Sequence, residues 1–384
     1  MMNSVLRKDV WEVSEQDFPE TGSIESQLCF LLRYAILAPS TKNSQPWAFS
    51  IQGNRIHVIA DRVRSLGVAD PDGRELYISL GCSLENLLVA AEHFGFRHGV
   101  TYFPEPGHDD LVATVLFARG GVPSHARVGA TIGAIVRRHN DNSVFRDTPV
   151  PEELRRRLMA CCVEPELRLN LTDDRQFRSW IDTLTREADR FEFANPAFRK
   201  ELGYWIGQGV FGARPLMAGL TRWAVTKLDI GREVADQDHA IVESAALLGL
   251  ISATGDDHLA HVRTGQLFER LWLTATAMGV SVHPMSQTMR RPELREVVTD
   301  LIPFPGWKPQ HPVSPGVLVA NRRVPHPAKT GGGCAGLRTG WRVRRRTASD
   351  AARHDSRMPP RQTLPPAVRQ TPAGGRPAAH RSSP

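Results

Sequence analysis

The sequence lacks the signatures of several common kinds of site. It contains no glycine-rich dinucleotide fingerprint and no phosphate-binding P-loop, so a Rossmann or P-loop nucleotide site is unsupported. Its five cysteines form no Cys-x-x-Cys pair and lack the spacing of zinc ligands. We expect them to be small buried residues or free thiols. His258 and His261 have no third ligand nearby in the sequence, so we predict no metal site.

Long apolar stretches are absent as well. The longest runs, such as residues 84–91, fall far short of the ~20 residues that a membrane-spanning helix needs. Residues 1–20 are mostly polar and acidic, unlike a secretory signal peptide. These absences favour a cytoplasmic protein with no membrane partner.

The positive charge is confined to one end of the chain. The formal net charge is +7, but residues 328–384 alone contribute eleven arginines and one lysine against two aspartates. The net charge of this tail is thus +10, which leaves −3 for residues 1–327. A mildly acidic body gives no reason to expect a nucleic-acid partner.

The tail also differs in composition from the rest of the chain. It is rich in Arg, Pro, Gly and Ala and contains no Ile, Phe or Tyr. Such a segment cannot bury enough apolar surface to offset the entropy lost on ordering, so we predict a disordered basic tail over residues 328–384. The same bias is typical of a GC-rich message translated in another frame, and resequencing the 3′ end of the gene distinguishes the two explanations.

Two segments of the remaining chain resemble each other. Residues 81–95 align without gaps with residues 265–279, at an offset of 184, and the alignment matches Gly81 with Gly265. Each segment has the pattern of an amphipathic helix that ends at a glycine and is followed by a short strand. The match favours an internal duplication over a chance similarity between two helices.

The elements around these two helices complete two comparable halves. In the first half, a helix over residues 26–37 precedes a hairpin of strands 47–52 and 55–60. In the second half, helices are expected over residues 130–137 and 149–162.

We therefore place the first half at residues 1–122 and the second at residues 123–327. The second half contains a helical insertion, about residues 179–231, with many bulky aromatic residues. This insertion serves either as a lid over a pocket or as additional core.

The most specific stretch is the loop A-P-S-T-K-N-S-Q-P-W, residues 38–47. Its two prolines stiffen the connection between a helix and a strand, and the tryptophan is expected to anchor the loop in the core. Short polar side chains between the prolines suit the edge of a flat heteroaromatic ligand, but they also suit a turn that satisfies its own backbone. The candidate ligand contacts are Pro39, Ser40, Thr41, Asn43 and Gln45.

A second candidate motif begins with two arginines. Arg137 and Arg138 are followed by His139, Asn140 and Asn142, and then by a Pro-Val-Pro sequence. Paired guanidinium groups beside short polar side chains can bind a phosphate through charge-assisted hydrogen bonds. On the residues alone, a solvated basic helix end is the favoured explanation of the same segment.

Together these motifs resemble the nitroreductase superfamily of FMN-dependent oxidoreductases. The loop looks like the APSxxNSQPWxF signature of that family, and the arginine segment resembles its RRxSxRxF opening with the later PVP. The two-part layout resembles the Acg-type branch, in which one chain looks like two fused nitroreductase subunits. The resemblance covers about residues 25–310 and implies an α+β, nitroreductase-like fold with two pseudo-symmetric halves. Asn142 and Ser143 depart from it, since an arginine is usual there.

The resemblance also implies how the parts of FMN would be held. The loop would contact the flavin ring, and the arginine segment would bind the phosphate and ribityl chain. Backbone near Pro284 and Met285 would lie against the ring, and Arg323 would contribute to a basic pair near the phosphate. In nitroreductase dimers each flavin lies at the subunit interface, with the loop from one subunit and the arginines from the other.

Each half of this chain keeps only one of the two motifs. Residues 11–18 are acidic where the first half would carry its arginines, and residues 161–166 replace the polar loop in the second half. We therefore predict one complete FMN site per chain. A monomer is expected, because the two halves mimic a dimer.

Two functions remain open. The first is an FMN-dependent oxidoreductase that passes electrons from NAD(P)H to a nitro-aromatic, a quinone or another flat acceptor. Because the flavin would carry the chemistry, no catalytic side chain is predicted. The second is a non-enzymatic protein that binds and sequesters FMN.

Overall fold

The computed structural model describes residues 13–140, 143–146, 148–208, 215–228, 231–302 and 304–316. All of them belong to one compact unit, Met1–Arg345. Asn142, Arg323 and the predicted tail lie outside the described residues.

The two halves contain antiparallel sheets with the same strand order. The first sheet has the order β1-β2-β4-β3, and the second has the order β5-β6-β8-β7. The strands are β1 (Trp47–Gln52), β2 (Arg55–Ala60), β3 (Phe96–Tyr102), β4 (Leu111–Arg119), β5 (Leu167–Thr172), β6 (Leu248–Ala253), β7 (Ser281–Pro284) and β8 (Lys308–Gly316). The predicted α+β architecture with two pseudo-symmetric halves is confirmed.

Helices accompany each sheet in a corresponding order. In the first half, α1 (Ile24–Ala35) precedes the β1-β2 hairpin and α2 (Arg74–His93) follows it. In the second half, α4 (Glu152–Ala160) precedes β5 and α9 (His258–Ala277) follows β6. Two further helices of this half are α3 (Ile132–Arg137) and α10 (Pro292–Leu301).

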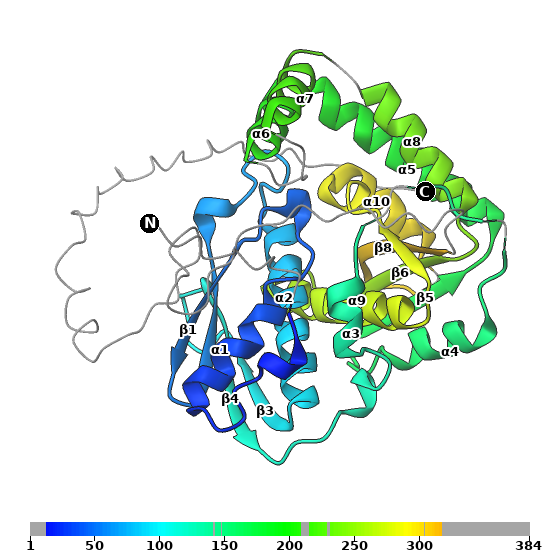
Figure 1. The fold of residues 1–384 in the computed structure, drawn as a ribbon. Helices are drawn as coiled ribbons and strands as arrows, with labels where there is room; N and C mark the ends of the chain where they lie inside the picture. Colours follow the sequence, from blue (N-terminus) through cyan, green and yellow to red (C-terminus); the bar gives the residue numbers. More distant parts are fainter. Residues whose placement is uncertain are drawn as a thin grey trace, which may run out of the picture. The chain divides into compact units, whose positions relative to one another are not determined.

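The long helices α2 and α9 pack against each other (Figure 1) and are buried on nearly all sides. They cross at a pair of glycines. A Cβ added to Gly81 would lie 2.0 Å from the carbonyl oxygen of Val262, and one added to Gly265 would lie 2.0 Å from that of Ile78. Ile78 and Val262 are separated by the same 184 positions as the two glycines. The crossing is therefore reciprocal, as in a twofold interface between identical subunits.

A single apolar core extends through both halves. It includes Leu28 and Trp47 from the first half, and Leu158 and Leu271 from the second. Local signals set the ends of the helices: the Ser23 side chain accepts the N–H of Ser26 at the start of α1, and Asp257 accepts that of Ala260 at the start of α9. The halves thus share one core, which fixes the elements of the first half against those of the second.

The insertion takes the place of a hairpin turn. Strands β1 and β2 are joined by a tight turn with Gly53 at φ 56°, whereas the equivalent strands β5 and β6 are separated by four helices. These are α5 (Arg175–Ala194), α6 (Pro196–Gly207), α7 (Pro215–Lys227) and α8 (Gly231–Ser244), so the helical segment extends beyond the expected residues 179–231 at both ends.

The insertion packs against both halves. Ile181 of α5 belongs to an apolar cluster with Leu248 and Leu294 of the second half. Phe198 of α6 belongs to another cluster with Leu66 and Ala69 of the first half. The insertion therefore adds core to the second half and also covers part of the first.

None of the helices in the described part of the chain has the length and apolar character needed to cross a membrane. Cys82, Cys161 and Cys162 are free, and the first two are buried.

Candidate functional site

The loop between α1 and β1 has unusual backbone angles. Lys42, Asn43 and Gln45 have φ values of 54°, 50° and 53°, in the left-handed region that residues with a Cβ seldom adopt. Among the described residues other than glycine, only Phe103 shares this conformation. Each such residue costs about 1–3 kcal/mol, and strain of this kind concentrates at functional sites. The strained backbone therefore makes this loop a candidate functional site.

Neighbouring elements hold the strained loop in place. The Ser40 hydroxyl accepts the N–H of Gln45 at 2.9 Å, and Arg64 donates to the Ser44 carbonyl at 3.0 Å. The Thr41 hydroxyl donates to the carboxylate of Glu75 in α2 at 3.0 Å. The interpretation as a self-satisfied polar turn thus explains the hydroxyl of Ser40, but neither that of Thr41, which bonds outside the turn, nor the left-handed backbone.

Glu75 belongs to a buried polar cluster that joins the two halves. Its carboxylate lies 3.1 Å from the Arg74 guanidinium, which also donates to the side-chain oxygen of Gln310 in β8 at 2.8 Å. Burial alone would raise the pKa of Glu75, but the charge of Arg74 and the hydrogen bond from Thr41 contribute to a net lowering. Glu75 is therefore a carboxylate that fixes the loop to α2.

Lys42 extends from the loop to the insertion. Its ammonium lies 5.0 Å from the centre of the Phe198 ring in α6, within cation–π range. Burial, followed by the nearby charge of Arg290, lowers the pKa of Lys42 below its ordinary value, against the opposing influence of Glu192 and Asp189. Lys42 stands inside the most specific motif but was not among the predicted ligand contacts.

The insertion places titratable acids beside this lysine. Asp189 of α5 is only 3% exposed, and burial followed by the charge of Asp238 raises its pKa to about 7. Burial also raises the pKa of Asp238 in α8 to about 6. Glu192 instead forms an ion pair with Arg290 at 2.7 Å. The loop is therefore next to groups that can exchange protons near neutral pH.

Arg138 connects the arginine segment with the helix that leads into the loop. Its guanidinium donates to the carbonyl of Leu37, just after α1, at 2.8 Å. It lies 3.2 Å from Glu269 as an ion pair without hydrogen-bond alignment, and 4.5 Å from the centre of the Trp272 ring. The side chain is only 4% exposed. Arg138 is thus a buried connection between the halves in direct contact with the loop-bearing segment.

The neighbours of Arg138 are closer to solvent. Arg137 and Asn140 are exposed, and His139 is half-buried with its Nδ1 2.9 Å from the Arg137 carbonyl. Arg137 therefore presents a solvent-accessible guanidinium one residue away from the buried one. The two arginines, treated alike in the sequence analysis, have different surroundings.

Pro284 and Met285 lie at the end of β7. The N–H of Met285 donates to the carbonyl of Pro312 at 3.2 Å, and its side chain is buried in the apolar cluster of the second half. Pro284 is half-buried and has no N–H. Neither residue therefore offers a free backbone N–H for a hydrogen bond to a ring.

In the other half, the segment after α4 is held by a different set of contacts. There Arg270 donates to the carbonyl of Cys161, just after α4, at 2.7 Å, as Arg138 does to Leu37 after α1. Arg270 also pairs with Glu85 and Glu164, each at 2.9 Å. Residues 161–166 are therefore tied to α9 by a buried ion-pair network where the first half has its polar loop.

Comparison with known proteins supports the resemblance that the motifs indicate. The chain is 27% identical over 302 residues to "Putative NAD(P)H nitroreductase Rv3131" of Mycobacterium tuberculosis, a match over 76% of this chain and 84% of that protein. It is 23% identical over 321 residues to "Putative NAD(P)H nitroreductase acg" of the same organism, covering 81% and 94%. No family model matches the chain.

Among solved structures, a nitroreductase from Desulfitobacterium hafniense with bound FMN is similar over 52% of this chain and 93% of its own. The sequence identity is 11% and the TM-score 0.34, which is too low to support an inference.

Proposed function

We propose that this chain, an Acg-type member of the nitroreductase superfamily, binds one FMN and passes electrons from NAD(P)H to a flat acceptor such as a nitro-aromatic or a quinone. Two mycobacterial relatives carry the name NAD(P)H nitroreductase. The observation that carries the proposal is the loop with three left-handed residues, in contact through Leu37 with the buried Arg138.

The residues present fit a flavin nucleotide. Pro39, Asn43 and Gln45 are proposed to meet the ring, in a backbone conformation held by Ser40 and Thr41. When bound, FMN would supply the hydride and electron chemistry. The protein would orient the ring and keep water from one face.

The phosphate end is proposed to lie at the arginine segment. Arg137, His139 and Asn140 stand at or near the surface and offer the positive charge and short polar groups that a phosphate needs. Arg138 would have an indirect role. Through its hydrogen bond to the Leu37 carbonyl just after α1, it would hold the loop in a fixed position relative to the phosphate-binding residues. Asn142 and Arg323, predicted at this end, lie outside the described residues.

FMN sequestration is the second candidate, and the position of the insertion favours it. Phe198 of α6 lies over Lys42 of the loop, and Glu201 of α6 accepts the N–H groups of Val68 and Ala69 at 3.0 and 2.9 Å. An insertion fixed in this way would limit access of an electron donor to the ring. Rapid mixing with NADPH separates the two functions: fast bleaching of the flavin band supports the oxidoreductase, and an unchanged band supports sequestration.

The site itself is tested by flavin content after purification. Asn43→Ala and Arg138→Ala are each expected to lose FMN, because Asn43 is proposed to contact the ring and Arg138 to hold the segment that leads into the loop. Asn43→Gly keeps the left-handed backbone without the side chain and is expected to lose FMN as well. Asn54→Ala in the β1-β2 turn, where the amide donates to Phe117, is the control and should keep it. Full retention of FMN in both Asn43→Ala and Arg138→Ala would show that the site is elsewhere.

A further inference from the structure

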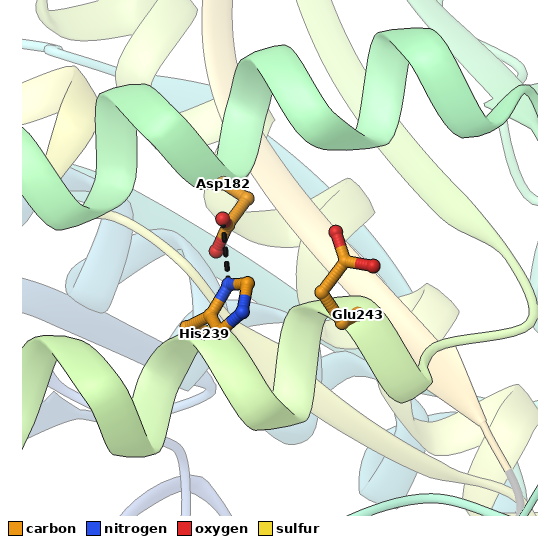
Figure 2. Close-up of side chains that lie close together, drawn as sticks. All are labelled: Asp182, His239 and Glu243. Carbon is orange, nitrogen blue, oxygen red and sulfur yellow. Dashed lines mark hydrogen bonds and ion pairs between the residues drawn. The ribbon is translucent and has the colours of Figure 1, made fainter.

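Three side chains of the metal-ligand type meet between two helices of the insertion. Asp182 comes from α5, and His239 and Glu243 come from α8 (Figure 2). One potential ligand atom from each lies within 4.8 Å of the other two. We propose that these residues bind a divalent transition-metal ion, with zinc the best match, at a site separate from the proposed flavin site.

The spacing of the residues supports a shared site. His239 and Glu243 are four positions apart on α8, so their side chains lie on one face of the helix, one turn from each other. Helix α5 packs along α8 and supplies the third residue from the opposite side. A bound ion would therefore join α5 to α8 through three protein ligands.

One carboxyl oxygen of Asp182 is buried without a hydrogen-bond partner in this cluster. The residue is 5% exposed, and its Oδ2 lies 2.7 Å from His239 Nδ1. Its Oδ1 is buried and has no hydrogen-bond partner among the described residues. Buried carboxylate oxygens without a partner are costly, and a metal ion would provide the missing contact.

The other two residues leave a path for an ion from solvent. The His239 side chain is 39% exposed and Glu243 is exposed. Figure 2 shows the Glu243 carboxylate directed towards α5, on the same side of α8 as the imidazole. An ion from solvent can therefore reach the cluster, whose potential ligand atoms lie within 4.8 Å of one another.

The local charge also favours a cation. The side chains of Asp182 and Glu243 supply two carboxyl groups to the cluster. Arg178 of α5 is the nearby opposing group, but it donates to the backbone carbonyls of Glu243 and Asp173, each at 3.5 Å, and forms no ion pair with the cluster. Arg186 is paired with Asp236 at 3.2 Å. An imidazole with two carboxylates suits zinc better than calcium or magnesium, which prefer oxygen ligands alone.

Binding would move a proton within the imidazole ring. In the metal-free protein the Nδ1 of His239 donates a hydrogen bond to Asp182 Oδ2, 2.7 Å away. With zinc on Nδ1, the ring proton would lie on Nε2, and the ion would complete its tetrahedral coordination with Asp182, Glu243 and a water molecule. With three protein ligands and an open fourth position, the site could hold zinc without any contribution from FMN.

The test is a calorimetric titration of zinc chloride into purified, chelator-treated full-length protein. We expect about one zinc ion per chain, no such binding in His239→Ala, and binding at least about tenfold weaker in Glu243→Gln. His93→Ala is the matched control. His93 is also 39% exposed and lies 2.8 Å from a single carboxylate, that of Glu15, so removing it should leave zinc binding unchanged.

Zinc uptake does not depend on flavin content, so this test is independent of the proposed function. The proposal is overturned if the wild-type protein binds no zinc at about 100 µM, if His239→Ala binds zinc as the wild type does, or if His93→Ala removes the binding. Because Glu243 is exposed, Glu243→Gln should fold normally, and unchanged zinc affinity in this variant would also contradict the site.

Discussion

The adjacent residues Arg137 and Arg138 have opposite environments. Arg138 is enclosed between Leu37, Glu269 and Trp272, whereas Arg137 is exposed. A buried cation whose partner is a buried carboxylate contributes to the fold as well as to any ligand. An exposed cation contributes mainly to ligand binding.

Arg138→Ala should therefore destabilise the protein by about 3 kcal/mol, because it leaves Glu269 buried without its partner. Arg137→Ala should change stability by less than about 0.5 kcal/mol, as exposed substitutions usually do. Urea unfolding of the flavin-free variants measures both free energies. Equal stability of the two variants would show that the burial of Arg138 has no energetic consequence.

At this scale the sequence predicts residue types better than their conformations. The motif identified the loop, but the left-handed angles of Lys42, Asn43 and Gln45 follow from contacts that the sequence does not reveal. Glu75, which holds Thr41, is distant in sequence. No sequence pattern indicated that Glu75 would fix the loop.

Among the elements, α2 and α9 depend on two glycines at their crossing. Gly81→Ala and Gly265→Ala should each destabilise the protein by about 1–3 kcal/mol or more, because a Cβ would lie 2.0 Å from a carbonyl oxygen of the other helix. The reciprocal contacts predict similar losses for the two variants. Gly99→Ala is the control, since a Cβ there has no atom within 4 Å. Chemical unfolding that affects only one of the two helix variants would contradict the symmetric crossing.

A second prediction at this scale concerns the acids on α5 and α8. The pKa of Asp189, raised to about 7, exceeds that of an unfolded aspartate, so the folded protein binds the extra proton. Its contribution to stability is therefore present at low pH and is lost as the pH rises towards 7. Asp189→Asn should raise the melting temperature at pH 8 relative to wild type and have little effect at pH 4.

The exposed Asp236→Asn is the control for this pH effect, because Asp236 pairs with Arg186 at the surface. A melting temperature of Asp189→Asn that follows the wild type at every pH would show that Asp189 is ionised in the folded protein throughout.

The sequence predicted most of these elements because they follow local patterns. The hairpin over residues 47–52 and 55–60 has the expected strand bounds, and the aligned residues 81–95 and 265–279 fall on the corresponding helices α2 and α9. The crossing of these helices at the two glycines was not predicted. The insertion was less predictable, since its helices extend over 175–244 and their partners lie in both halves. Helical periodicity shows that a face is buried, but it does not identify the element that covers it.

At the scale of the whole molecule, similar halves differ where a ligand would bind. The first half has the strained polar loop after α1, and the second has a buried network of Arg270, Glu85 and Glu164 after α4. In the second half, the segment that corresponds to the polar loop is held by the side chains of Arg270, Glu85 and Glu164. This difference agrees with the prediction of a single FMN site, which rests on the one motif that each half keeps.

The most direct test of that claim is the molar ratio of FMN to protein, measured from the visible spectrum and the protein concentration after saturation with FMN and removal of the excess. The account predicts about one FMN per chain, reduced towards zero by Asn43→Ala. A ratio near two would mean that the pseudo-symmetric position also binds, and the absence of flavin binding would contradict the proposed site.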